Sequence, residues 1–312
     1  MKKQTITLAK QILWQLSPGM FSRLVRDQHP QTFSIGIYTG NSPLTLSQPH
    51  NISNPVLTAA DVWDVPAGFV ADPFMLTKND RWFMFFEVFN KVLRRGCIGV
   101  ASSEDCQRWQ YMGTAVKESF HMAYPQVLQH DGEVLMIPDT PGQGVRLYRA
   151  VDFPLRWDFV ETIVADTTIV DPTLTFYNDQ WWLFAGGLTS DGNVLPMRIY
   201  HATQLEGPWR EHPQSPIATT DIKSARPSGA IVAFDDRLYR FAQDGEPTYG
   251  SRVRGFEITD LTPGTYQERE VEGSPLLEAG PAHWQSGGMH HMDAHEIESD
   301  RWVACVDGWF ST

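Results

Sequence analysis

Cysteine is scarce in this sequence. The 312 residues include only three cysteines, at positions 97, 106 and 305, and no two of them form a Cys-x-x-Cys pair. An odd and widely spaced set argues against a disulfide framework and against a cysteine zinc site. We therefore expect a reducing compartment, the cytoplasm.

Long apolar runs and basic stretches are also absent. No apolar run approaches 18 residues, so we expect no membrane-spanning helix. The net charge of -12 and the lack of a Lys/Arg stripe exclude a nucleic-acid partner, because phosphate binding needs positive charge. No GxGxxG, P-loop or GxSxG motif occurs. The acidity fits a neutral or cationic small ligand, and no pattern indicates an oligomeric state.

The N-terminal 32 residues are predicted to form a helical extension. Ile6, Ala9, Leu13 and Leu16 follow helical spacing, and the sequence 17–19, Ser-Pro-Gly, would end the helix. We expect a short amphipathic helix that packs on the domain, with peripheral membrane contact as the alternative.

Five stretches with a period of roughly 50 residues can be superimposed. Three of the stretches contain a residue followed by proline, and nine residues after it a strand-like run begins. These residues are Asp72, Tyr124 and Asp171. Fifteen residues after each of these comes a second matched position, at Glu87, Asp139 and Gly186. The other two stretches match less closely and pair Ser228 with Gln243 and Met292 with Asp307. Repeats of this length, rich in β-formers, are typical of a β-propeller.

The repeats predict an all-β, five-bladed propeller over residues 33–312. A blade needs about four strands, yet the fifth repeat ends soon after Asp307. Residues 33–38 look like a strand, so we expect this N-terminal strand to complete the last blade and remove an exposed edge. A pair of β-sandwiches is the alternative fold.

The matched positions should form an acidic ring at one end of the channel, because an antiparallel strand returns to the end where its neighbour began. Crowded carboxylates raise one another's pKa, so an acid and a base can coexist at neutral pH, as glycoside hydrolysis requires. The predicted catalytic residues are Asp72, Glu87, Asp139 and Asp171. The predicted substrate-binding residues are Tyr124, Arg226, Gln243, His290, His291, Asp293 and Asp307.

Ordinary structural roles are the alternatives at these positions. Asp72 and Asp171 precede proline and could simply make turns, and Glu87 could form a salt bridge with Arg94 or Arg95. Arg226 could bind substrate or neutralise the ring.

The histidine run at 290–295 also has alternatives. Adjacent histidines on a strand point to opposite faces, so His290 and His291 should not both enter the channel. We expect no required cofactor and no dedicated zinc site. A single channel metal ion, calcium, with one histidine ligand is the alternative.

The sequence resembles a known family. Residues 69–74 (FVADPF) resemble the blade-one opening of family 43 propeller glycosidases, and residues 201–209 resemble their blade-three ending. More closely, the chain resembles the N-terminal domain of plant glucosamine inositolphosphorylceramide transferases and their bacterial relatives, through residues 54–57, 121–125, 136–139, 147–154 and 181–184.

The resemblance implies a role for Asp72 as the general base. Family 43 enzymes then use an Asp in blade two and a Glu acid in blade three, where this chain has Tyr124 and Asp171. The general acid is therefore left open among Asp171, Glu87 and Asp139. We expect a carbohydrate ligand and, most simply, a glycoside hydrolase acting on a surface or lipid-linked glycan. The alternative is a non-catalytic glycan-binding or scaffold propeller associated with glycolipid biosynthesis.

Overall fold

The computed structural model describes residues 29–217 and 223–311, together with seven residues of a short N-terminal helix: Thr7, Ala9, Lys10, Ile12, Leu13, Trp14 and Leu16. The predicted helix is present; on its expected packing face Leu13 is half-buried, whereas Ala9 is exposed and Leu16 is 80% exposed. Ile6 and the expected stop at 17–19 lie outside the described residues. No helix in the described part of the chain is long and apolar enough to cross a membrane.

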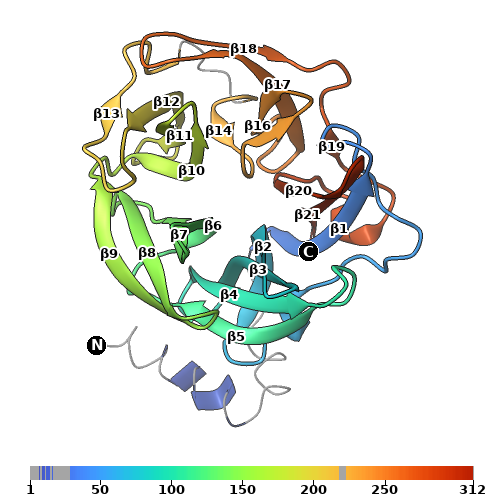
Figure 1. Cartoon of the computed structure of the whole chain (residues 1–312). Helices are drawn as coiled ribbons and strands as arrows, with labels where there is room; N and C mark the ends of the chain where they lie inside the picture. Colours follow the sequence, from blue (N-terminus) through green and yellow to red (C-terminus); the bar gives the residue numbers. More distant parts are fainter. Residues whose placement is uncertain are drawn as a thin grey trace.

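Five antiparallel sheets surround a common axis (Figure 1). Blade 1 contains β2(Ala67–Lys78), β3(Arg81–Asn90), β4(Arg95–Ser103) and β5(Gln110–Val116). Blade 2 contains β6(Ala123–His130), β7(Glu133–Asp139), β8(Val145–Asp152) and β9(Arg156–Val164). Blade 3 contains β10(Ile169–Tyr177), β11(Gln180–Leu188), β12(Val194–Ala202) and β13(Arg210–Glu211). The predicted five-bladed propeller is confirmed.

The last two blades are less regular. Blade 4 has an interrupted inner edge, β14(Arg226–Pro227) and β15(Val232–Phe234), followed by β16(Arg237–Asp244), β17(Arg252–Leu261), β18(Tyr266–Glu270) and β19(Leu277–Glu278). Blade 5 consists of β20(Met292–Glu298), β21(Arg301–Ser311) and β1(Gln31–Gly40). Short 3-10 turns, η1(Ala59–Asp61) and η2(His283–Gln285), lie in connections.

The N-terminal strand closes the ring, as predicted. β1 pairs antiparallel with β21 along its whole length, from Gln31 opposite Ser311 to Gly40 opposite Trp302. The first and last segments of the propeller therefore share one sheet, which Figure 1 shows as a blue strand beside a red one. This pairing removes the open edge that β21 would otherwise present.

Inner strands are apolar on both faces because each blade packs between two neighbours. On β3, Phe83 and Phe85 pack against blade 2 in a cluster with Tyr124. The alternating residues Met84 and Phe86 pack toward blade 5 in a cluster that includes Ile37 of β1. The continuous run of apolar residues in this repeat thus fills two separate interfaces.

The recurring tryptophans of the repeats close the turns before the outer strands. The indole N–H groups of Trp109, Trp157 and Trp209 donate hydrogen bonds to the backbone carbonyls of Cys106, Pro154 and Leu205, at 3.3, 2.8 and 2.8 Å. In each of three blades a tryptophan therefore satisfies a backbone carbonyl three or four residues before it.

The residue–proline pairs of blades 1 to 3 share one unusual backbone shape. Asp72, Tyr124 and Asp171 have φ values of 52°, 47° and 51°, and the strand pairing slips at each of them. A left-handed residue before proline is strained, at a cost of about 1–3 kcal/mol each. The three sites are β-bulges that take one side chain out of the ordinary strand alternation.

Candidate active site

The strand register brings the matched positions together. Glu87 lies opposite Ala71, Asp139 opposite Ala123, and Gly186 opposite Val170, so each second position lies next to the bulged residue of its own blade. In blade 4, Gln243 pairs directly with Arg226. All of them therefore lie at one end of the propeller, as the antiparallel argument predicts.

Asp72 is contacted mainly from blade 5. Its backbone N–H donates to Asp307 Oδ2 at 3.0 Å. Its carboxylate Oδ1 lies 3.5 Å from His290 Nε2 and 3.9 Å from His291 Nδ1. Burial raises the pKa of Asp72 to about 7, against the lowering effect of His290. Near neutral pH this carboxyl group is therefore able both to take up and to release a proton.

The following residue, Pro73, is held from the same side. Its carbonyl accepts hydrogen bonds from His291 Nε2 and from Cys305 Sγ, both at 2.9 Å. Burial lowers the pKa of His291 to about 4, so this ring is neutral at pH 7. The strained bulge of blade 1 is thus fixed by three side chains, those of Asp307, His291 and Cys305.

The expectation that His290 and His291 would point to opposite faces is wrong. Both rings approach Asp72 Oδ1 within 4 Å. The reason is that β20 begins only at Met292, so the two histidines lie before the strand and its alternation does not apply to them.

Asp307 and His290 form a buried pair. Asp307 Oδ1 accepts from His290 Nδ1 at 2.8 Å and from the His290 backbone N–H at 3.3 Å. Burial alone would raise the pKa of Asp307, but His290 lowers it below the ordinary value. Burial alone would lower the pKa of His290, but Asp307 raises it. Each group therefore favours the charged form of the other.

Within the described part of the chain, two carboxyl groups, those of Glu87 and Asp139, have an unpaired buried oxygen. Among the described residues, neither Glu87 Oε1 nor Asp139 Oδ1 has a hydrogen-bond partner. The pKa of Glu87 is raised well above 4.5, first by burial and then by Asp72. The pKa of Asp139 is raised well above 3.8, first by burial and then by Asp171. Both groups therefore keep their proton at a higher pH than an ordinary carboxyl group does.

The salt bridge considered as the alternative role of Glu87 does not form. Arg95 donates instead to the carbonyl of Ser119, and no ion pair joins Glu87 to Arg94 or Arg95 in the described chain. The basic group near Glu87 is His121, whose Nε2 lies 3.6 Å from Oε1. Burial lowers the pKa of His121 to about 4, so it offers no positive charge at neutral pH.

Asp171 differs from the other three carboxylates because it is neutralised. Its Oδ2 accepts from Arg226 Nε at 2.6 Å and from Gln243 Nε2 at 3.2 Å. The arginine fits here because the second matched position of blade 3 is Gly186, where a Cβ would lie 3.1 Å from Arg226 Cγ. Of the two roles expected for Arg226, this ion pair favours neutralisation of the ring, and the role of Asp171 as general acid stays a prediction.

Two of the predicted binding residues make contacts between blades, and their binding role stays a prediction. The Tyr124 hydroxyl accepts from the Gly229 N–H at 2.6 Å and shares a 2.8 Å hydrogen bond with Thr173. Asp293 Oδ2 accepts from the Met75 N–H at 2.8 Å and lies 2.7 Å from His295 Nε2. The structure therefore places Tyr124 and Asp293 in the interfaces that join blades 2, 3 and 4 and blades 5 and 1.

A metal at this end of the channel would have to use Asp72, His290 and Asp307, whose candidate ligand atoms lie within 4.8 Å of one another. Both oxygens of Asp307 already accept hydrogen bonds from Asp72 and His290. Calcium needs six to eight oxygen ligands, which this trio does not supply. The trio fits a hydrogen-bonded cluster better than a calcium site, and the channel metal stays a prediction.

Tyr249 belongs to the site and was missed by sequence reasoning. Its side chain is 43% exposed, and its ring lies 5.2 Å from the Arg226 guanidinium and 5.1 Å from the His290 ring. The residue lies in the connection between β16 and β17, outside every repeat position, so no periodic signal marks it.

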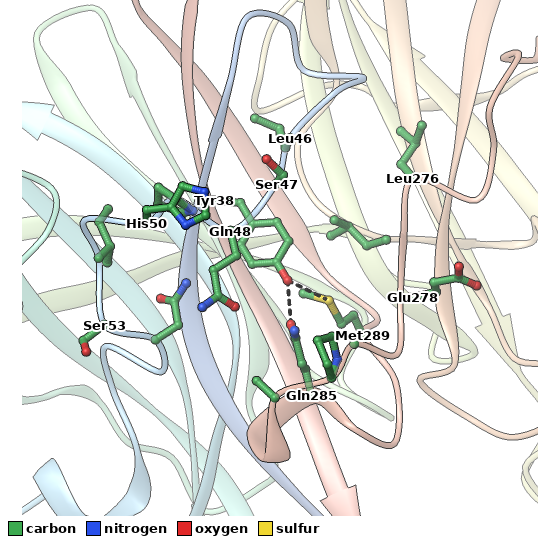
Figure 2. Close-up of a pocket in the computed structure, with 17 residues that line it drawn as sticks. Tyr38, Leu46, Ser47, Gln48, His50, Ser53, Leu276, Glu278, Gln285 and Met289 are labelled. Carbon is green, nitrogen blue, oxygen red and sulfur yellow. Dashed lines mark hydrogen bonds between the residues drawn. The ribbon is translucent and has the colours of Figure 1, made fainter.

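A separate cavity of about 690 Å³ lies between the loop after β1 and the segment from β19 to Met289 (Figure 2). On its floor the Tyr38 hydroxyl donates to Gln285 Oε1 at 2.5 Å and lies 3.7 Å from Met289 Sδ. Among its lining residues the acidic side chain is Glu278. This cavity could hold a small molecule, but it lacks the pair of carboxyl groups that acid–base chemistry needs.

Comparison with known proteins identifies the family. Residues 25–309 match the model of the family described as glucosamine inositolphosphorylceramide transferase 1, N-terminal. The chain belongs to this family. It is 36% identical over 297 residues to glucosamine inositolphosphorylceramide transferase 1 of Oryza sativa subsp. japonica, and 32% identical over 305 residues to that of Arabidopsis thaliana. The matches cover 89% and 91% of this chain but only 40% of each relative.

Solved structures with a similar fold include glycoside hydrolases. An exo-β-1,3-galactanase from Phanerochaete chrysosporium has a TM-score of 0.59 at 15% identity, covering 85% of this chain and 58% of that one. A thermostable family-43 glycoside hydrolase has a TM-score of 0.57 at 14% identity, covering 83% and 92%. At these identities the likeness shows a shared propeller fold. Both comparisons lead to carbohydrate-related proteins.

Proposed function

We propose that this propeller is a glycoside hydrolase whose site is the channel end lined by Asp72, Glu87 and Asp139. The observation that carries the proposal is the pair of buried, unpartnered carboxyl oxygens, Glu87 Oε1 and Asp139 Oδ1. Leaving such atoms unpaired costs stability, and a bound glycan would supply the missing hydroxyl groups. A surface or lipid-linked glycan is the proposed substrate, because the relatives' name includes inositolphosphorylceramide.

The reaction uses one carboxyl group as a general base and another as a general acid. Asp72 takes a proton from water, and the water oxygen attacks the anomeric carbon as the bond to the leaving oxygen breaks. Glu87 or Asp139 gives its proton to that leaving oxygen. The raised pKa values of Glu87 and Asp139 keep the acid protonated, and the pKa of about 7 for Asp72 leaves a useful fraction of base at neutral pH.

A non-catalytic glycan-binding propeller is the second candidate. It is favoured by one observation: the blade-three carboxylate Asp171 is neutralised by Arg226, and blade two offers Tyr124 where a carboxylate would be expected. Such a protein would use the same ring to bind a sugar without cleaving it.

The deciding experiment measures hydrolysis and binding together. Purified protein is incubated with aryl glycosides of glucose, glucosamine, galactose and arabinose, and binding of the matching methyl glycosides is measured by calorimetry. The variants are Asp72→Asn, Glu87→Gln and Asp139→Asn, with Asp179→Asn as a control because Asp179 is exposed in the turn between β10 and β11.

A hydrolase should lose at least about a hundredfold in kcat with Asp72→Asn and with one of the two acid variants, while methyl glycoside binding and the control variant are unaffected. Binding without turnover in the wild-type protein, with the variants altering only affinity, would replace the hydrolase by the binding module. Neither turnover nor binding across the panel would reject both candidates.

A further inference from the structure

The loop between β16 and β17 places one aromatic ring at the edge of an otherwise buried site. Asp72, Glu87 and Asp139 are only 5–6% exposed, whereas Tyr249 is 43% exposed. A large exposed aromatic side chain beside buried acid groups is the arrangement of a ligand-binding wall, since pockets combine apolar surfaces with a few polar groups.

The Tyr249 ring contacts a guanidinium group and an imidazole ring of the site. The Arg226 guanidinium lies 5.2 Å from the ring centre, and the His290 ring meets it edge-on at 5.1 Å. The ordinary pKa of a tyrosine phenol is about 10, well above neutral pH. The hydroxyl therefore stays protonated and is available as a hydrogen-bond donor.

The backbone carbonyls of Tyr249 and of the residue after it are tied to blade 5. Gln31 Nε2 donates to the Tyr249 carbonyl at 2.7 Å, and Trp309 Nε1 donates to the Gly250 carbonyl at 2.8 Å. Gly250 has φ 78°, and a Cβ there would lie 3.0 Å from Trp309 Nε1. The ring is thus mounted on a fixed segment, so that little conformational entropy is lost when a ligand binds.

We propose that Tyr249 is the binding platform for the sugar whose glycosidic bond faces Asp72 and the acid pair. Its open face covers the apolar face of the sugar ring, and its hydroxyl donates to a ligand oxygen. The inference rests on the proposed function, because it needs a glycan at this end of the channel. It adds a specificity-determining residue that lies outside the repeat positions.

A purely structural role is the competing explanation. Tyr249 would then only cover the ion pair between Arg226 and Asp171, and its removal would loosen that pair. Tyr249→Phe keeps the ring and the cover over Arg226 and should keep most of the affinity under both explanations, so the melting temperature of Tyr249→Ala is what separates them.

The test uses the full chain and saturation-transfer NMR with the methyl glycosides of glucose, glucosamine, galactose and arabinose. Tyr249→Ala should raise the Kd of the bound sugar about tenfold, and Tyr249→Phe should raise it within about threefold. Tyr177→Ala is the matched control, because Tyr177 is 38% exposed at the other end of blade 3. The melting temperature is measured for each variant.

Each possible outcome either supports or overturns the proposed platform. Weaker binding in Tyr249→Ala, with an unchanged melting temperature and an unaffected control, supports the platform. Wild-type affinity in Tyr249→Ala overturns it and leaves the proposed function intact. A fall in melting temperature that accounts for the lost binding assigns Tyr249 to structure and overturns the platform. Failure of the wild-type protein to bind any of the four sugars overturns the platform and the proposed function together.

Discussion

Replacing Asp307 by Asn should show how much the negative charge of this buried group, as distinct from its size, contributes to stability. Asp307 is fully buried and accepts three hydrogen bonds, from the Asp72 N–H, the His290 N–H and His290 Nδ1. Asn keeps the size but offers one acceptor oxygen and one N–H₂ group. The N–H₂ group of the Asn side chain would then face one of the N–H donors of Asp72 or His290.

The expected loss in the free energy of unfolding is about 3–5 kcal/mol, since removing one partner of a buried ion pair leaves the other uncompensated. For a chain of this length that corresponds to about 5–10 °C in melting temperature. The His290 pKa is raised above 6.5, so its contribution is fully present below pH 6.5 and is lost as the pH rises through the folded value. The Asp307 pKa is lowered below 3.8, so its contribution is lost only in strong acid.

The assay is urea unfolding of wild type and Asp307→Asn at pH 5.5 and pH 9, with Asp179→Asn as the control. The difference between wild type and variant should be largest at pH 5.5 and should shrink by at least about 1 kcal/mol at pH 9. A cost below about 1 kcal/mol at pH 5.5, or equal costs at both pH values, would refute the charge pairing on which this account of the site depends.

Three further predictions follow from individual contacts. The pKa of Glu87 is raised above 4.5 in the folded protein, so above pH 4.5 this carboxyl group ionises more readily in the unfolded chain. Its ionisation therefore favours unfolding of the wild type as the pH rises. Glu87→Gln should therefore be more stable than wild type by at least about 1 kcal/mol at pH 8 and not at pH 4, by urea unfolding; lower stability at pH 8 would contradict this. Gly229→Ala should prevent folding or cost more than about 3 kcal/mol, because its Cβ would lie 1.7 Å from the Met292 carbonyl oxygen. Gly132→Ala, with φ 80° and nothing within 4 Å, is its control and should cost only about 1 kcal/mol in thermal unfolding. Tyr124→Phe should cost about 1–3 kcal/mol by leaving the hydrogen bonds of its buried hydroxyl unmade, and an unchanged melting temperature would show that the hydroxyl does not join the blades.

The fold could be predicted because its evidence is periodic. The proline-linked positions Asp72, Tyr124 and Asp171 recur at the blade spacing, and all three prove to be left-handed bulges. The strand at 33–38 could be assigned to the last blade because an incomplete fifth repeat needs a partner, and β1 supplies it. The packing face of the N-terminal helix was not predictable in this way, because helical spacing identifies an apolar stripe without showing what covers it.

The chemical state of each ring residue depended on contacts between blades. Nothing local to Asp171 shows that Arg226 reaches it, since the arginine belongs to the next blade and fits only because Gly186 leaves space. Tyr249 lies in a connection outside the repeat, so no spacing marked it as part of the site.

The all-β class, the blade repeat, the closing strand and the gathering of carboxylates at one end of the channel are all encoded in the spacing of residues along the chain. Hydrogen-bonded strands convert that spacing into position on a blade. Contacts between blades set the unpaired oxygens of Glu87 and Asp139, the neutralisation of Asp171, and the approach of His290 and His291 to Asp72. The physical reason is that pKa values and hydrogen-bond partners depend on burial and on neighbours within a few ångströms, and here those neighbours come from other blades.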